Sequence, residues 1–226
     1  MGKLIVFEGI DGSGKSTQFE LLCSRLTSEG REFKRLVFPR YDNPSSALIK
    51  MYLSGEFGNN PESINAYAAS SFFAVDRYAS FIQDWSEYYI SGGLILTDRY
   101  TTSNALHQGA KIDVGQRELF FKWLYDYEFN LIGLPKPDLV LYMDIEAEFV
   151  ASRLRHRQFQ TGVDADIHER DIDYLKSSAE SGSQAAAQFG WHHVKCISDK
   201  ASRSKDEIHT EIYDTIFNLL YSPPVA

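Results

Sequence analysis

The sequence has few cysteines, little positive charge and no long apolar run, and each shortage excludes a class of protein. It contains only Cys23 and Cys196, so a disulfide framework or a zinc site is excluded by number. No apolar run approaches the ~18 residues that a membrane span needs. The short apolar run near the N-terminus lacks the cleavage pattern of a signal peptide. We therefore expect a cytoplasmic protein without a membrane partner.

Positive charge is scarce. The chain carries 23 Lys and Arg against 31 Asp and Glu, a formal net charge of −8. Proteins that bind duplex nucleic acid or anionic lipid usually carry the opposite sign, so we expect no nucleic-acid partner. A phosphate ligand would have to be held by a few well-placed cations, which makes each local arginine informative.

The residues that are present suit one α/β domain. The chain has 226 residues, of which 43% are hydrophobic, a composition typical of a single globular unit. Short β-branched runs alternate with longer segments of helical periodicity, which predicts a parallel sheet flanked by helices. The expected strands are 3–8, 33–39, 93–98, 138–144 and 191–198.

A glycine-rich segment follows the first expected strand. Residues 9–17, GIDGSGKST, match the phosphate-binding loop (P-loop) pattern G-x-x-x-x-G-K-[ST] and precede an expected helix. Lys15 would reach the β- and γ-phosphates of a nucleotide, and the Ser16 hydroxyl would hold magnesium. The expected nucleotide-binding residues of this loop are Gly9, Asp11, Gly12, Ser13, Gly14, Lys15, Ser16 and Thr17.

Charged residues also end two later strands. Asp98 ends the apolar run LILTD, as does the second magnesium-organising acid of P-loop proteins. The alternative is that Asp98 caps a helix that starts near Thr101. Arg40 and Arg99 also follow strands, and open α/β sheets bind ligands at the carboxyl ends of their strands. We therefore expect a phosphate site at this edge.

The clearest helix covers residues 64–90. Phe73 and Arg77 lie one turn apart, on the face opposite an apolar stripe that we expect to face the core. They form either a surface Phe packed under an Arg stem or a platform on which a flat ligand stacks and hydrogen-bonds. The stripe consists of Ile64, Ala68, Phe72, Val75, Ala79 and Ile82.

The segment 153–170 is polar and begins with Arg153, Arg155 and Arg157. It is either a solvated loop or a mobile lid over nucleotide phosphates. Phosphoryl transfer spreads negative charge that a mobile arginine often stabilises, and the P-loop itself contains none. Arg157, which is nearest to the flexible stretch, is the arginine that we expect to play this part.

Five blocks in this order resemble the thymidylate kinase family, of the bacterial kind, from about residue 3 to 144. They are FEGIDGSGKSTQ, VFPRYD, FFAVDRY, TDRYTTSNA and GLPKPDLVLYMDI. The resemblance implies one domain over residues 1–226, of the P-loop nucleoside monophosphate kinase type. It implies a five-stranded parallel sheet, a lid at about 153–170, and a homodimer.

The resemblance also implies magnesium-dependent phosphoryl transfer from ATP to dTMP, which yields dTDP and ADP. Lys15 and Arg99 join Arg157 as expected catalytic residues, and Ser16 and Asp98 would hold the metal. Phe73 would stack on thymine, and Arg77 would donate to its O4. The expected substrate-binding residues are Asp11, Phe38, Arg40, Tyr41, Phe73, Arg77, Arg99, Asn104 and Glu169.

The residues alone leave two other functions open. A P-loop NTPase switch would use the same loop, although the sequence lacks the guanine-reading pattern N-K-x-D. A kinase for another pyrimidine nucleotide or for a deoxynucleoside would share the Phe73 and Arg77 platform. Arg40 and Arg99 favour an acceptor that already carries phosphate.

Overall fold

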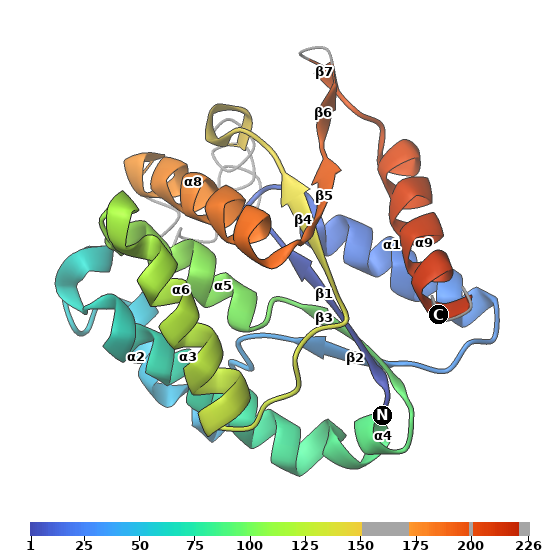
Figure 1. The fold of residues 1–226 in the computed structure, drawn as a ribbon, viewed down its shortest axis with the longest axis horizontal. Coiled ribbons are helices and arrows are strands. Elements are labelled where there is room, and N and C mark those ends of the chain that lie inside the picture. The colour runs from blue at the N-terminus through green and yellow to red at the C-terminus, as the bar shows by residue number, and fades with distance from the viewer. Residues whose placement is uncertain (151–171, 199–200, 222–226) are drawn as a thin grey trace.

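The computed structural model describes residues 1–150, 172–198 and 201–221. Five strands form one parallel sheet in the order β2-β3-β1-β4-β5 (Figure 1). All five predicted strands are confirmed, four of them with shorter bounds. They are β1 (Lys3–Glu8), β2 (Lys34–Val37), β3 (Leu94–Asp98), β4 (Leu139–Asp144) and β5 (His192–Lys195). A small antiparallel pair, β6 (Ile197–Ser198) and β7 (Ala201–Ser202), follows β5.

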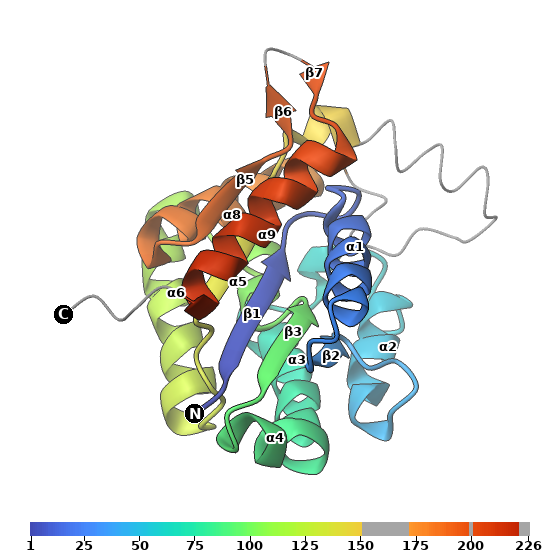
Figure 2. The ribbon, with the colours of Figure 1, turned by 90° about the vertical axis from the view of Figure 1, so that its right-hand side faces the viewer.

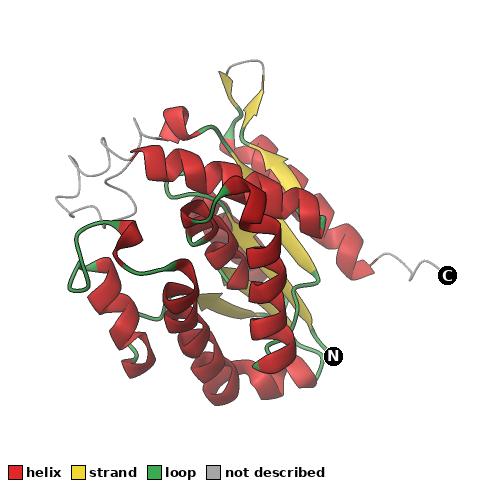
Figure 3. Ribbon diagram, turned by 60° about the vertical axis from the view of Figure 1, so that its left-hand side comes forward, coloured by secondary structure: helices red, strands yellow, loops and turns green. Residues whose placement is uncertain are grey.

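Helices enclose the sheet on both faces (Figure 2 and Figure 3). Helices α1 and α9 cover one face, whereas α3, α5, α6 and α8 lie on the other (Figure 1). Across the described ranges, no helix is long and apolar enough to span a bilayer. The helices are α1 (Lys15–Ser28), α2 (Ala47–Leu53), α3 (Ala66–Ser80), α4 (Ser86–Ile90), α5 (Thr101–His107), α6 (Arg117–Tyr125), α8 (Ile172–Phe189) and α9 (Lys205–Tyr221).

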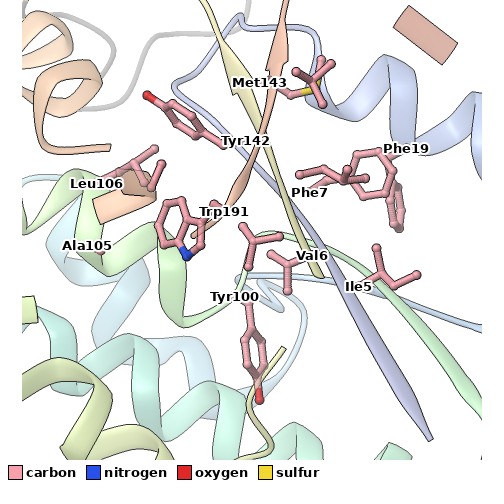
Figure 4. Packing of buried hydrophobic residues seen from close by; sticks show 14 of the residues in the cluster. Ile5, Val6, Phe7, Phe19, Tyr100, Ala105, Leu106, Tyr142, Met143 and Trp191 are labelled. Atoms are coloured by element: carbon pink, nitrogen blue, oxygen red, sulfur yellow. The ribbon is translucent and has the colours of Figure 1, made fainter. Parts of the chain in front are cut away.

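The central strand β1 is buried on both faces, because its alternate side chains enter two separate halves of the core. On one face Phe7 meets Phe19 of α1 edge to face, with ring centroids 5.4 Å apart. On the other face Tyr142 packs on Trp191, next to α5 (Figure 4). The carboxyl end of β1, from which the P-loop starts, is therefore rigidly held.

The predicted helix at 64–90 consists of α3, a π-helical turn (Phe81–Trp85) and α4. The prediction that its apolar stripe faces the core holds for Ile64 and Phe72, which pack against a small buried cluster, and is wrong for Val75 and Ile82. Val75 and Ile82 are 53% and 55% exposed, whereas Arg77 is 2% exposed. A guanidinium can be buried when a carboxylate compensates it. Glu128 supplies this carboxylate. It lies outside the helix, so the periodicity of residues 64–90 could not reveal the pairing.

The predicted lid at 153–170 lies outside the described residues. The expected roles of Arg157 and Glu169 therefore stay predictions.

Candidate active site

A cavity of about 270 Å³ lies at the carboxyl ends of β1, β2 and β3. Its wall comes from the P-loop, the segment after β2, and helices α3 and α5. The parallel topology thus gathers residues that are far apart in the sequence. Ten predicted site residues line the cavity: Asp11, Lys15, Ser16, Phe38, Tyr41, Phe73, Arg77, Asp98, Arg99 and Asn104.

The P-loop has the backbone that its glycines predict. Gly12 and Gly14 have φ values of 80° and 96°, in the left-handed region that favours glycine. Gly14 is also the N-cap of α1, and no side chain caps this helix end. The first N–H groups of α1 are therefore available to an anion. The Lys15 Nζ lies beside them, 3.4 Å from Asp11 Oδ1.

Ser16 and Asp98 form a pair of oxygen ligands. The Ser16 hydroxyl donates to Asp98 Oδ2 at 2.7 Å, while Asp98 Oδ1 is buried and accepts no hydrogen bond from the described residues. The capping alternative for Asp98 is wrong, because Tyr100 is the N-cap of α5 and no side chain caps that end. Hydroxyl and carboxylate oxygens are the ligands that Mg²⁺ prefers, and it usually keeps several waters. The pair therefore fits magnesium.

Arg99 is held as a fixed cation in the cavity wall. Its φ of 70° is strained for a residue other than glycine. Its guanidinium forms an ion pair with Asp11 and lies 3.8 Å from Glu8. Burial acts to lower the pKa of Arg99, but the carboxylates of Asp11, Glu8 and Asp98 raise it above its ordinary value. Arg99 thus stays charged.

His107 is a neutral hydrogen-bond partner of Arg99. Burial and the Arg99 charge lower the pKa of His107 to about 3. The His107 Nε2 lies 3.0 Å from Arg99 Nη1. Because a guanidinium only donates, Nε2 must accept, so the proton of the neutral ring is on Nδ1. His107 therefore helps to orient the Arg99 cation.

Sequence reasoning missed Glu8, the buried carboxylate directly before the P-loop. It accepts hydrogen bonds from the Gly9 N–H at 2.9 Å and from the Thr102 and Ser103 hydroxyls, both at 2.7 Å. Burial raises the pKa of Glu8. These bonds tie the P-loop to the start of α5. An acid at the end of an otherwise apolar strand is the signal that could have revealed it.

The aromatic part of the cavity contains Phe73. Its ring meets Tyr52 edge to face, with centroids 6.4 Å apart. The Tyr52 hydroxyl in turn accepts a hydrogen bond from Lys111 Nζ at 2.7 Å. Burial lowers the pKa of Lys111 to about 7. Tyr52 and Lys111, from two other segments, thus pack beside the Phe73 ring.

The amide of Gln108 is a second feature that sequence reasoning missed. Gln108 is fully buried in the cavity wall, yet neither Oε1 nor Nε2 has a hydrogen-bond partner in the described part of the chain. A buried amide without partners carries a desolvation cost that a polar ligand would offset. Its position four residues after Asn104 in the sequence could have revealed it.

Arg40 is held next to the cavity. Its backbone N–H donates to Asp76 Oδ2 at 2.9 Å, and its guanidinium donates to the Ser45 hydroxyl at 3.2 Å. The Arg40 Nε lies 3.5 Å from Asp76 Oδ1. Its neighbours Pro39 and Tyr41 line the cavity, whereas Arg40 is not part of the wall.

A second hollow of about 420 Å³ lies against the P-loop. Its other side is formed by Cys196 after β5 and by Arg203 and Lys205 before and at the start of α9. Gly9 lines neither hollow. The remaining predicted loop residues line the second hollow: Gly12, Ser13, Gly14 and Thr17.

Comparisons with known proteins identify the family of this chain. The family model described as Thymidylate kinase matches residues 7–212. The chain is 34% identical over 192 residues to the thymidylate kinase of Mycobacterium tuberculosis (strain ATCC 25618 / H37Rv), which covers 83% of this chain and 87% of that protein. It is 26% identical over 222 residues to that of Plasmodium falciparum (isolate 3D7), covering 98% and 93%.

A solved structure gives the same result for the fold. The thymidylate kinase from Candida albicans superposes with a TM-score of 0.72 at 24% identity and covers 95% of this chain and 91% of that chain. The family model spans nearly the whole chain. The chain therefore belongs to the thymidylate kinase family.

Proposed function

We propose that this protein uses magnesium and ATP to phosphorylate dTMP, which binds in the cavity at the ends of β1, β2 and β3. Family membership carries the activity itself: the chain is a phosphotransferase that converts dTMP into dTDP. One observation supports the residue assignments. A single cavity is lined by the P-loop lysine, a pair of metal-type oxygens, a fixed arginine and an aromatic ring with amides.

The chemistry needs positioning and charge stabilisation. An oxygen of the dTMP phosphate attacks the γ-phosphorus of ATP, the bond to the β-phosphate oxygen breaks, and ADP leaves. The phosphate oxygen is already anionic, so no strong general base is required. Lys15 offsets the charge of the β- and γ-phosphates, and Arg99 holds the acceptor phosphate with Tyr41. Arg40 reaches the same phosphate on a change of its side-chain position.

Ser16 and Asp98 would hold magnesium. Magnesium held there would supply positive charge that offsets the negative charge of the nucleotide phosphates. The buried Asp98 Oδ1, which accepts no bond from the described residues, and the Ser16 hydroxyl beside it support this assignment.

The thymine would lie on Phe73. Arg77 donates from Nη1 to the thymine O4, because its Nε and Nη2 are engaged by Glu128. The amides of Asn104 and Gln108 would face the remaining polar edge of the base, and Asp11 would contact the sugar 3′-hydroxyl or magnesium. Phe38 lines the same cavity.

The adenine of ATP would occupy the second hollow, between the P-loop and the segment after β5. Arg203 and Lys205 line it and suit an anionic nucleotide. The family resemblance also implies an adenine contact near residues 198–199, and residue 199 lies outside the described residues.

An acceptor panel tests the proposal. We expect dTMP to be phosphorylated at least ~10-fold faster than dCMP, dGMP, AMP or free thymidine in a coupled ADP-release assay, because the base contacts and Arg99 act together. Equal rates with thymidine and dTMP would contradict the phosphate site. Nucleotide hydrolysis that no acceptor stimulates would favour an NTPase switch instead.

We propose a homodimer formed through α3. The exposed side chains Val75, Tyr78 and Ile82 lie on one face of this helix and its π-helical extension. Light scattering should give twice the chain mass of 25.7 kDa. Ile82→Glu should give the single mass, because a charge is costly in an apolar interface. A parent protein that is monomeric at all concentrations would refute the dimer.

Three other features belong to this proposal. Residues 1–226 would form one domain with a lid at about 153–170.

The bacterial type is supported by the sequence identities. The chain is more similar to the Mycobacterium tuberculosis relative than to the Plasmodium falciparum relative. Cys23 and Cys196 are not joined in a disulfide, which supports a cytoplasmic location, where thiols stay reduced.

A further inference from the structure

We propose that Glu128 is a positioning residue that determines base specificity, because it fixes Arg77 and Asn104 in the geometry that reads thymine. The inference rests on the roles proposed above for those two side chains. Glu128 does not line the cavity, so it would act on the nucleotide only through them.

The Glu128 carboxylate is fully buried and fully used. Its Oε2 accepts from Arg77 Nε at 2.7 Å and from the Thr101 hydroxyl at 2.7 Å. Its Oε1 accepts from Arg77 Nη2 and from Asn104 Nδ2, the latter at 3.1 Å. A carboxylate has about four lone-pair positions, and these bonds occupy them all. Glu128 therefore has no capacity left for a ligand of its own.

These bonds join three separate parts of the chain. Arg77 is on α3, Thr101 and Asn104 are on α5, and Glu128 is in the π-helical segment Asp126–Leu131 that follows α6. Helices α3 and α5 both contribute to the cavity wall. A bond network that spans both helices fixes the distance between the residues that face the base. π-Helical turns are rare in proteins, and those that do occur are often found at functional sites.

The paired contact also determines which polar atoms face the cavity. Two bonds hold the plane of the guanidinium, and no hydrogen bond from the described residues uses Arg77 Nη1. The cavity therefore meets a fixed donor that has no acceptor capacity. A carbonyl at position 4 of a pyrimidine can accept from it, whereas an amino group there would place donor against donor. Glu128 thus holds the Arg77 side chain in an orientation that favours a carbonyl over an amino group at position 4 of the base.

Glu128→Gln tests the inference, because it keeps the shape and removes the charge. We expect KM for dTMP to rise at least ~10-fold, the dTMP-to-dCMP preference in kcat/KM to fall at least ~10-fold, and KM for ATP to change less than ~2-fold. The matched control is Glu118→Gln, the same change at an exposed glutamate of α6 paired with Lys122. The control should leave all three quantities unchanged.

A double-mutant cycle separates this inference from the proposed function. Arg77→Ala alone should lower kcat/KM for dTMP roughly 10- to 150-fold. Adding Glu128→Gln should then cost only ~2- to 3-fold more, less than its cost in the parent, because only its effect through Asn104 remains. If Arg77→Ala has no effect, the proposed base site is wrong. If Arg77→Ala has its effect while Glu128→Gln has none, only the inference is wrong.

Thr101→Val provides a test that leaves every charge in place. Removing one partner of a buried ion pair can unfold a protein, so Glu128→Gln could fail to fold. Thr101 lies outside the cavity wall, and its replacement removes one of the two hydrogen bonds to Glu128 Oε2 and leaves the one from Arg77 Nε. We expect a ~3- to 10-fold rise in KM for dTMP, with KM for ATP unchanged. An unchanged KM for dTMP, or an equal effect on both substrates, would overturn the inference.

Discussion

Replacing Lys15 with alanine is expected to lower kcat at least ~1000-fold while the protein stays folded. The Lys15 ammonium is almost fully buried beside the open N-terminus of α1. Its positive charge stabilises the transition state more than the ground state, because negative charge moves between the phosphates during transfer. The low dielectric of a closed site strengthens this interaction. The alanine variant keeps the backbone of the loop and loses only this charge.

Two measurements check the Lys15 prediction. Steady-state ADP release with saturating dTMP and ATP gives kcat, and thermal melting reports the fold. Because Lys15 has a single 3.4 Å contact with Asp11 among the described ion pairs, its loss should move the melting temperature by only a few degrees. Lys122→Ala, at an exposed lysine, is the matched control and should retain full activity. A fall in kcat of less than ~10-fold would show that Lys15 does not serve the transferring phosphate.

Asp98→Asn should lower kcat about 100- to 1000-fold at ordinary magnesium concentrations. The amide is nearly isosteric and can still accept from the Ser16 hydroxyl, which donates at 2.7 Å in the parent. What it loses is the negative charge that attracts the ion. The amide is a weaker ligand for a hard cation, so the magnesium concentration needed for half-maximal activity should rise at least ~10-fold.

A magnesium titration decides this second prediction. High magnesium should restore part of the activity of the Asp98 variant, because the lost affinity is offset by mass action. Asp84→Asn, at an exposed carboxylate paired with Lys34, makes the same chemical change away from the cavity and should leave the titration unchanged. If the Asp98 variant has the parent's magnesium dependence, Asp98 is a structural partner of Ser16 and not a metal ligand.

The parts of this protein that depend on neighbouring residues could be predicted from the sequence. The P-loop is one contiguous stretch, and its function depends on backbone geometry that Gly12 and Gly14 allow locally. The alternation of strands and helices is equally local, and it predicted the parallel sheet and the positions of its five strands. In a parallel sheet the carboxyl ends of the strands share one edge, where ligands bind. This rule predicted that Asp98 and Arg99 lie at that edge, and both line the cavity there.

Pairings across long sequence separations could not be predicted in this way. Arg40 follows β2 as expected, yet Asp76 of α3 holds it next to the cavity. Gln108 is an ordinary polar residue in the sequence, and only the packing around α5 makes it a buried amide with no partner among the described residues. Burial and partners depend on which elements meet, and sequence periodicity does not report that.

Helix α3 shows the division clearly. Its sequence determined a helix on which Phe73 and Arg77 lie one turn apart, and the structure shows that both reach one cavity. The tertiary structure alone decided which face is buried. Apolar spacing marks one side of a helix, but it does not decide whether that side packs on the core. Arg77 entered the interior because a glutamate 51 residues away compensates its charge, and that long-range electrostatic pairing exists only once the chain is folded.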